Sequence, residues 1–310
     1  MTISTQTVPL DRPVTVMGIT PEAFSSDSTQ IAQTLGPRLF DHRGVTTIGS
    51  LGVFTDVVIG APAAAALRDR AGEPVGTVLA QLSVSAANRF PAGGRIVGTG
   101  RVLHTDDATS LAEAEIVDES DILVAHVVGR AMSVGRARID DAETLPDAVT
   151  QSVPEPEPWD GPESLSGRSG LGIVEGIADG TISRGPLAAL LGLRVQHSER
   201  GRVDARVTPA EWMANRYGSI HGGVLVSIAD TIAGLAAQTL PEQGGQYRIL
   251  NLGIDYLRSP DAPGPDVRTQ AEVVRAGRRL ATIEARLTGE DGTVFFRAHA
   301  NAQLFAASSD

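Results

Sequence analysis

Residues 221–237 read HGGVLVSIADTIAGLAA, and this stretch decides the fold. It is apolar on nearly every side, which predicts a helix over about 222–238 that other elements wrap. One carboxylate, Asp230, lies in its middle. A buried carboxylate is costly unless a partner compensates it. Asp230 therefore has either a structural partner or a chemical role.

The start of this predicted helix suits an anion. Gly222 and Gly223 open it, and the first amides of a helix lack intrahelical partners while the helix dipole adds partial positive charge. Because glycine has no Cβ atom, a ligand can approach these amides closely. The helix start is a candidate oxyanion site. The nearby Asn215 is a candidate to hold a carbonyl group or a water molecule.

Asp230 cannot serve this helix start itself. It follows His221 by nine residues, which is about 13 Å along a helix, and it points to the opposite face. A carboxylate for the oxyanion site must therefore come from a second helix.

A weak internal repeat supplies that second helix. After a shift of 174 residues, segment 44–56 (GVTTIGSLGVFTD) lies over segment 218–230 (GSIHGGVLVSIAD). The shift matches Gly44 with Gly218, Gly49 with Gly223, Asp56 with Asp230, Gly60 with Gly234 and Asp41 with Asn215. Further along, with a slightly different shift, Arg89 meets Arg258. Each match alone is weak, but their order indicates a duplication.

Two repeats related by a pseudo-two-fold axis predict two composite sites. The first combines Asp56 with Asn215, His221 and Gly222. The second combines Asp230 with Asp41, Thr47 and Ile48. Because the second lacks the Asn, the His and the first Gly, we expect Asp56 to be the main catalytic carboxylate. His221 is expected to have a structural role or to position the substrate. The other histidines, His42 among them, show no metal-ligand spacing and are interpreted as incidental.

The predicted domain organisation follows from segment 137–168, which is rich in Pro, Asp, Glu and Ser and contains PEPEP. Such a segment is typical of a linker. It separates a degenerate first repeat, 1–136, from a second repeat, 169–310. The expected fold class is α+β, with a long apolar helix and about five antiparallel strands in each repeat. In the second repeat we expect strands at 201–207, 247–257, 267–276, 279–288 and 293–304.

Composition excludes several classes of function. The 310 residues carry a net charge of −11 and only 4% aromatic side chains, which disfavours a nucleic-acid partner. The absence of cysteine excludes disulfides and thiolate nucleophiles, and no residue pattern indicates a metal site. The N-terminus lacks a secretory signal pattern, and we find no apolar run of membrane-spanning length. We expect a cytoplasmic protein without a membrane partner.

The pattern Asn215-x5-His221-Gly222-Gly223-x6-Asp230, followed by IDYLRSP at 254–260, resembles a known family. It is similar to the phenylacetyl-CoA thioesterase (PaaI) type of hotdog-fold acyl-CoA thioesterase. The resemblance covers roughly residues 180–305, and the N-terminal half resembles a degenerate hotdog repeat. It implies two hotdog repeats that form a pseudo-dimer within one chain.

The resemblance also implies roles for residues. A carboxylate from one repeat would activate water or attack the thioester, the amide at Gly222 would polarise the carbonyl, and Asn215 would orient water or substrate. The candidates for binding substrate, including the coenzyme A phosphates, are Gly223, Arg258, Arg278 and Arg279. Segment 248–251 (RILN) departs from relatives that carry a polar residue early in this strand. No cofactor or metal is implied, because coenzyme A is part of the substrate.

We therefore expect an enzyme that hydrolyses aryl- or medium-chain acyl-CoA thioesters, in a homo-oligomer of double-repeat chains. One alternative is a non-catalytic acyl-CoA-binding or regulatory module, which would bind the ligand without turnover. Another is a hotdog hydratase or dehydratase, which usually needs a different arrangement of Asp and His.

Overall fold

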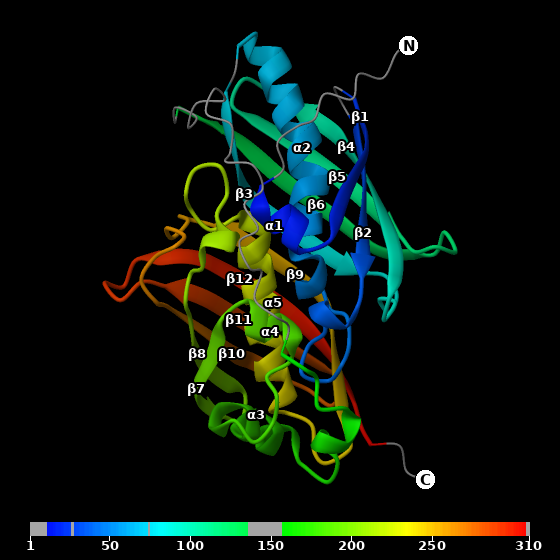
Figure 1. Ribbon diagram of the computed structural model, residues 1–310, viewed down its shortest axis with the longest axis vertical. Coiled ribbons are helices and arrows are strands. Elements are labelled where there is room, and N and C mark those ends of the chain that lie inside the picture. Colours follow the sequence, from blue (N-terminus) through cyan, green and yellow to red (C-terminus); the bar gives the residue numbers. More distant parts are fainter. Residues whose placement is uncertain (1–10, 26–27, 74, 136–156, 308–310) are drawn as a thin grey trace.

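The computed structural model describes residues 11–25, 28–73, 75–135 and 157–307, which form two similar halves (Figure 1). The first half contains α1 (Arg12–Val16), β1 (Ile19–Phe24), β2 (Ser28–Leu35), α2 (Gly52–Ala71), β3 (Gly76–Ala86), β4 (Gly94–Thr105), β5 (Thr109–Val117) and β6 (Leu123–Val134). The second half contains α3 (Gly170–Asp179), α4 (Pro186–Leu190), β7 (Leu193–Glu199), β8 (Arg202–Val207), α5 (Gly222–Gln238), β9 (Gln246–Tyr256), β10 (Val267–Ala276), β11 (Leu280–Thr288) and β12 (Val294–Phe305). Short 3-10 helices occur at η1 (Pro37–Leu39), η2 (Gly49–Leu51), η3 (Pro162–Leu165) and η4 (Glu211–Met213).

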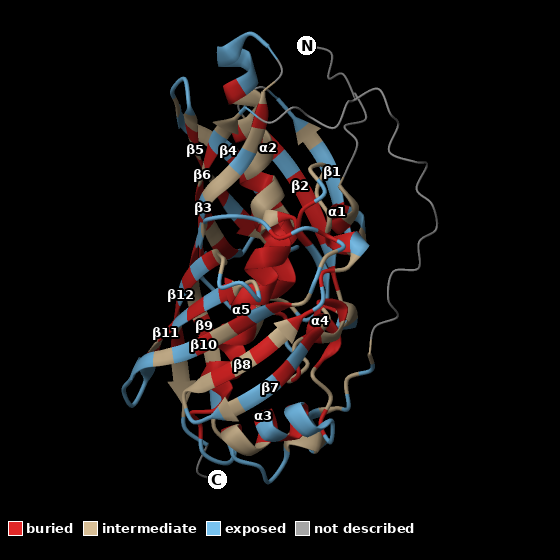
Figure 2. Cartoon of the chain, turned by 90° about the vertical axis from the view of Figure 1, so that its left-hand side faces the viewer, coloured by how far each residue is buried: buried red, intermediate tan, exposed pale blue. Residues whose placement is uncertain are grey.

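The predicted long helix of the second repeat is confirmed as α5. His221 caps its start, where its Nδ1 atom accepts a hydrogen bond of 3.1 Å from the amide of Gly223. Almost every residue of α5 is buried, as Figure 2 shows. The predicted strands of this repeat are confirmed as β8 to β12, with ends within one residue of the prediction. The prediction omitted β7, whose apolar residues merge with those of α4 in the sequence.

The strands of the described residues join one twelve-stranded antiparallel sheet, in the order β1-β2-β4-β5-β6-β3-β9-β12-β11-β10-β8-β7. The two halves meet where β3 pairs with β9. Ser83 faces Gly253 there, and Leu82 and Val84 face Ile254 and Leu252. Gly253 lies 170 positions after Ser83 and is its counterpart in the second half. Because the two counterparts pair with each other, the pseudo-two-fold axis passes through this pair. The fold is therefore two hotdog units, each with a central helix wrapped by half of the sheet, joined edge to edge.

The two central helices touch at their N-terminal ends, and glycine makes this contact possible. A Cβ atom at Gly52 would collide with the Gly223 carbonyl oxygen and the Ser227 hydroxyl, and one at Gly223 would collide with the backbone of Val53. The Ser227 hydroxyl also donates a hydrogen bond of 2.6 Å to the Gly49 carbonyl. Each helix start is consequently held beside the body of the opposite helix.

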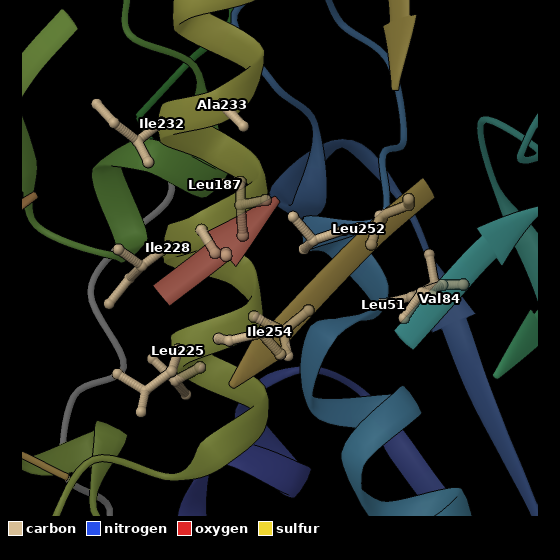
Figure 3. Close-up of a cluster of buried hydrophobic side chains, with 14 of the residues drawn as sticks. Leu51, Val84, Leu187, Leu225, Ile228, Ile232, Ala233, Leu252 and Ile254 are labelled. Atoms are coloured by element: carbon tan, nitrogen blue, oxygen red, sulfur yellow. The ribbon is translucent and has the colours of Figure 1, made fainter. Parts of the chain in front are cut away.

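The core runs without a break through both halves. Figure 3 shows Leu51 and Val84 of the first half packed in one cluster with Leu225, Leu252 and Ile254 of the second. All five side chains are at most 1% exposed. Burial of this shared apolar surface stabilises the pairing of the halves.

One described helical run, Gly49–Ala71, is long and apolar enough by composition to cross a membrane. Of its most apolar 18-residue stretch, 61% is buried inside the protein. The expectation that no apolar run reaches this length was therefore wrong. The run is η2 and the central helix α2, whose apolar surface is used to pack against the sheet.

The predicted linker, 137–168, lies mostly outside the described residues. Its described end contacts both halves. The Trp159 indole donates a hydrogen bond of 3.1 Å to the His42 carbonyl of the first half, and Glu157 pairs with the Arg184 guanidinium of the second. The boundaries 1–136 and 169–310 stay a prediction.

Candidate active sites

The first composite site lies at the start of α5. Asp56 projects from α2 towards Gly222, and its Oδ2 atom lies 3.6 Å from His221 Nδ1. A Cβ atom at position 222 would collide with this carboxylate, so any larger residue there must displace it. The predicted approach of Asp56 to Gly222 and His221 is therefore present in the structure.

The Asp56 carboxylate is largely enclosed. Burial raises its pKa, while His221 and the Gly223 amide act in the opposite direction. The Tyr256 side chain also lies beside Gly222, since its hydroxyl group donates a hydrogen bond of 3.3 Å to the Gly222 carbonyl oxygen. Tyr256 was not among the residues predicted from the sequence.

Asn215 has a clear structural function in the loop before α5. Its Oδ1 atom accepts hydrogen bonds from the amides of Tyr217 at 2.9 Å and Ser219 at 3.3 Å. These bonds fold the loop into the turn that positions His221. The proposed contact of Asn215 with substrate or water stays a prediction.

The second composite site repeats this geometry with Asp230. Its Oδ2 atom accepts a hydrogen bond of 2.8 Å from the Gly49 amide, where Gly49 is the counterpart of Gly223. The loop turn is also repeated, because Asp41 Oδ1 accepts hydrogen bonds from the amides of Arg43 at 2.8 Å and Val45 at 3.2 Å. Asp41 thus does for this site what Asn215 does for the other.

Asp230 differs from Asp56 in its electrostatics. It is 2% exposed, and its Oδ1 atom has no hydrogen-bond partner among the described residues. Burial raises the pKa of Asp230 to about 6, although Thr47 and the Gly49 amide act to lower it. A carboxylate with this pKa is ionised at neutral pH and still basic enough to accept a proton.

A cavity of about 630 Å³ opens at Asp230. Its walls come from both halves of the chain: the loop 41–48 with Arg89 and Phe90, the end of the linker with α3 and α4, one face of α5, and the start of β9 with Phe305. Asp56, Asn215, His221 and Gly222 do not line it. The cavity thus belongs to the composite site that the sequence ranked second.

The cavity carries excess positive charge. Its lining includes two aspartates, Asp41 and Asp230, and five arginines, Arg43, Arg89, Arg168, Arg184 and Arg248. Burial opposes ionisation of Asp41, but the Arg43 guanidinium holds the pKa of this carboxyl below its usual range. Arg43 also stacks 3.7 Å above the ring of Tyr247. Since Arg43 is committed to Asp41 and Arg184 to Glu157, the charge for an anionic ligand comes from Arg89, Arg168 and Arg248.

The three arginines proposed from the sequence lie elsewhere. Arg258 is exposed after β9, near Asp291. Arg278 and Arg279 line a separate surface hollow at the turn between β10 and β11. None of the three lines the cavity at Asp230. Arg89, the repeat counterpart of Arg258, does line it, and the repeat alignment contained this signal.

The interpretation of His42 as incidental does not agree with the structure. His42 is 4% exposed, lines the cavity, and its Nε2 atom lies 3.0 Å from Gln238 Oε1. Nothing in the sequence pattern distinguishes it, because Gln238 lies 196 positions away. Among the described residues, no group of three His, Asp or Glu side chains could hold a metal ion.

Comparison with known proteins identifies the family of this chain. The profile of the thioesterase superfamily matches residues 217–296. A candidate esterase of Saccharolobus solfataricus is 30% identical over 102 residues, which are 33% of this chain and 71% of that protein. A second, from Halobacterium salinarum, is 31% identical over 103 residues, or 32% of this chain and 66% of that protein.

Solved structures extend the similarity of fold to both halves. The tesB protein of Mycobacterium avium subspecies paratuberculosis has a TM-score of 0.60 at 9% identity, covering 94% of this chain and 97% of that one. The acyl-CoA thioesterase II TesB2 of Mycobacterium marinum has a TM-score of 0.59 at 12% identity, covering 96% and 99%. The fold defines a double-hotdog protein. The chain belongs to the thioesterase superfamily, an enzyme family of thioester hydrolases.

Proposed function

We propose that this protein hydrolyses acyl-CoA thioesters in the cavity at Asp230. The observation that carries the proposal is the Asp230 carboxylate, which is buried at the cavity wall with one oxygen atom unpaired. An unpaired buried oxygen is costly, and a water molecule or a substrate in the cavity would relieve this cost. The sequence analysis expects Asp56 to be the main catalytic carboxylate, whereas this proposal assigns that role to Asp230.

The proposed chemistry is general base catalysis. The Asp230 carboxylate removes a proton from a water molecule, and the water oxygen forms a bond to the thioester carbon. The carbonyl oxygen becomes an oxyanion, the C–S bond then breaks, and the leaving thiolate takes the proton from Asp230. These steps release a carboxylic acid and free coenzyme A.

The amide of Ile48 is the proposed oxyanion donor. Ile48 lies one position before Gly49, at the start of the α2 region, and it lines the cavity. Within the described part of the chain its amide donates no hydrogen bond. A preorganised donor of this kind contributes about 3 kcal/mol to transition-state stabilisation.

The arginine-rich wall supports coenzyme A as the leaving group. Arg89 and Arg168 are exposed and Arg248 is half-buried, so their charges lie where a phosphorylated ligand can reach them. The apolar residues that also line the cavity suit an aryl or medium-chain acyl group. This agrees with the PaaI-like pattern of the C-terminal half.

The site at Asp56, with Asn215, His221 and Gly222, is the second candidate for the same reaction. Its parts lie together in the structure, with the Asp56 carboxylate beside the Gly222 position. A cytoplasmic location, a homo-oligomer of double-hotdog chains, and the boundaries at 136 and 169 are further proposals from the sequence.

The test is release of free thiol from a panel of aryl- and fatty-acyl-CoAs by the purified protein. The proposal expects hydrolysis of at least one of them, and competition by free coenzyme A. If the thioesters bind without turnover, the non-catalytic binding module replaces the enzyme.

A further inference from the structure

The cavity continues from Asp230 along α5. Asp230, Thr231, Gly234, Leu235 and Gln238 all line it, and their spacing places them on one face of the helix. Gln238 follows Asp230 by eight positions, which corresponds to about 12 Å along the axis. The cavity therefore has a reactive end at Asp230 and a far end at Gln238.

The cavity lining also includes apolar side chains. Among them are Ile173, Leu187, Ala188 and Leu235. Gly234 faces Tyr247, and a Cβ atom at this position would lie 2.8 Å from the Tyr247 hydroxyl oxygen. Glycine at this position therefore lets the Tyr247 side chain, which also lines the cavity, lie against the helix. A wall of this composition suits the hydrocarbon part of an acyl group.

The far end is polar. His42 and Gln238 are 4% and 3% exposed, and His42 Nε2 lies 3.0 Å from Gln238 Oε1. Because a carbonyl oxygen only accepts, the imidazole must donate through Nε2. Burial lowers the pKa of His42 and keeps the ring neutral, so Nδ1 is an acceptor.

Two hydrogen-bonding groups at this end have no described partner. Neither His42 Nδ1 nor the amide nitrogen of Gln238 makes a hydrogen bond with a described residue. One accepts and the other donates, and a hydroxyl group can satisfy both.

The pair is not a requirement of the hotdog unit. In the other half, the shift of 174 residues places Arg216 at the position of His42 and Ala64 at the position of Gln238. The pair is thus present only where the cavity lies.

We propose that His42 and Gln238 select acyl groups that carry a hydroxyl group at the end remote from the thioester. This inference rests on the proposed function, because it assigns the acyl half of the substrate in the same cavity. It predicts that the hydroxylated member of a matched substrate pair is preferred. A site built to hydrogen-bond a hydroxyl group discriminates against the analogue that lacks it.

The test compares matched pairs: ω-hydroxyoctanoyl-CoA with octanoyl-CoA, and para-hydroxyphenylacetyl-CoA with phenylacetyl-CoA. The proteins are wild type, Gln238→Leu, His42→Phe and the control Gln30→Leu, which makes the same change on an exposed position of β2. The readout is the ratio of kcat/KM within each pair. Dissociation constants of both members are measured by calorimetry with Asp230→Asn, alone and combined with Gln238→Leu.

For at least one pair, wild type and Gln30→Leu should prefer the hydroxylated ester by roughly tenfold or more, and Gln238→Leu should remove most of this preference. A loss of kcat/KM that is equal for both members would mean that the pair binds a part of the substrate common to both, or only supports the loop 41–48, and would overturn the inference. If wild type hydrolyses no thioester, the proposed function fails. The dissociation constants then decide the inference alone, and equal binding of both members overturns it.

Discussion

Asp230 on α5 accepts a hydrogen bond of 2.8 Å from the amide of Gly49, a residue 181 positions earlier in the chain. This bond joins the carboxylate of one hotdog unit to the helix start of the other. Gly223 occupies the same place beside Asp56, which makes the two sites near copies of each other. They differ in that only the residues of the Asp230 site line the cavity of about 630 Å³.

The first prediction concerns the pH dependence of hydrolysis. Burial raises the pKa of Asp230 to about 6, and a general base works only when ionised. We expect kcat to rise with pH through about 6 and to level off near 7, with one ionisation on the acidic side. A profile measured on the best thioester checks this. A rate that stays flat between pH 5 and 7 would contradict the role of Asp230 as base.

The second prediction concerns stability. The folded-state pKa of Asp230 is raised above its usual 3.8, so its favourable contribution is complete below about pH 4 and is lost as pH rises through about 6. Two pKa units correspond to about 3 kcal/mol as an upper value. Asp230→Asn should therefore raise the free energy of unfolding at pH 7.5, by up to about 3 kcal/mol, and change it little at pH 4. Denaturant unfolding at both pH values measures this, and destabilisation at pH 7.5 would show that the ionised group is favourably compensated.

The third prediction concerns the glycine beside the carboxylate. A Cβ atom at Gly49 would lie 3.0 Å from Asp230 Oδ2 and 3.2 Å from the Ser227 carbonyl oxygen, so Gly49→Ala must displace the carboxylate. We expect kcat to fall roughly tenfold to hundredfold, since small misplacements of catalytic groups have such effects. Gly36→Ala is the matched control, because a Cβ atom there meets nothing within 4 Å. Steady-state kinetics of both variants make the comparison, and equal kcat values would refute it.

The fourth prediction separates two assignments of the coenzyme A site. Arg89 lines the cavity, whereas Arg278 lies in a different hollow. Arg89→Ala should raise KM for acyl-CoA about tenfold, but not for the matching N-acetylcysteamine thioester, which has no phosphates. Arg278→Ala should leave both KM values unchanged. If Arg278→Ala raises KM for acyl-CoA and Arg89→Ala does not, the coenzyme A phosphates bind at the turn between β10 and β11, as expected from the sequence.

Much of the fold could be predicted from the sequence. The apolar run at 222–238 has helical spacing throughout, and the matching aspartates at 56 and 230 revealed the duplication. These signals were sufficient to bring Asp56 beside Gly222, and Asp230 beside Thr47, in the expected arrangement. The apolar run at Gly49–Ala71 was missed because small residues and Pro62 dilute it.

The location of the cavity could not be predicted in the same way. A motif such as HGG is visible in the sequence, but a cavity depends on how distant segments close around it. Here His42 meets Gln238 across 196 positions, and the linker end contributes Leu165 and Arg168 to the wall. Counting motif residues therefore favoured Asp56, whereas the enclosed space lies at Asp230.

The most direct test of this account is thiol release by wild type, Asp230→Asn and Asp56→Asn, measured side by side on the best acyl-CoA after circular dichroism has confirmed the fold of each. The account predicts that Asp230→Asn loses activity at least a hundredfold, while Asp56→Asn retains most of it. If Asp56→Asn is the inactive variant and Asp230→Asn is close to wild type, catalysis takes place at the start of α5, and the central claim is wrong.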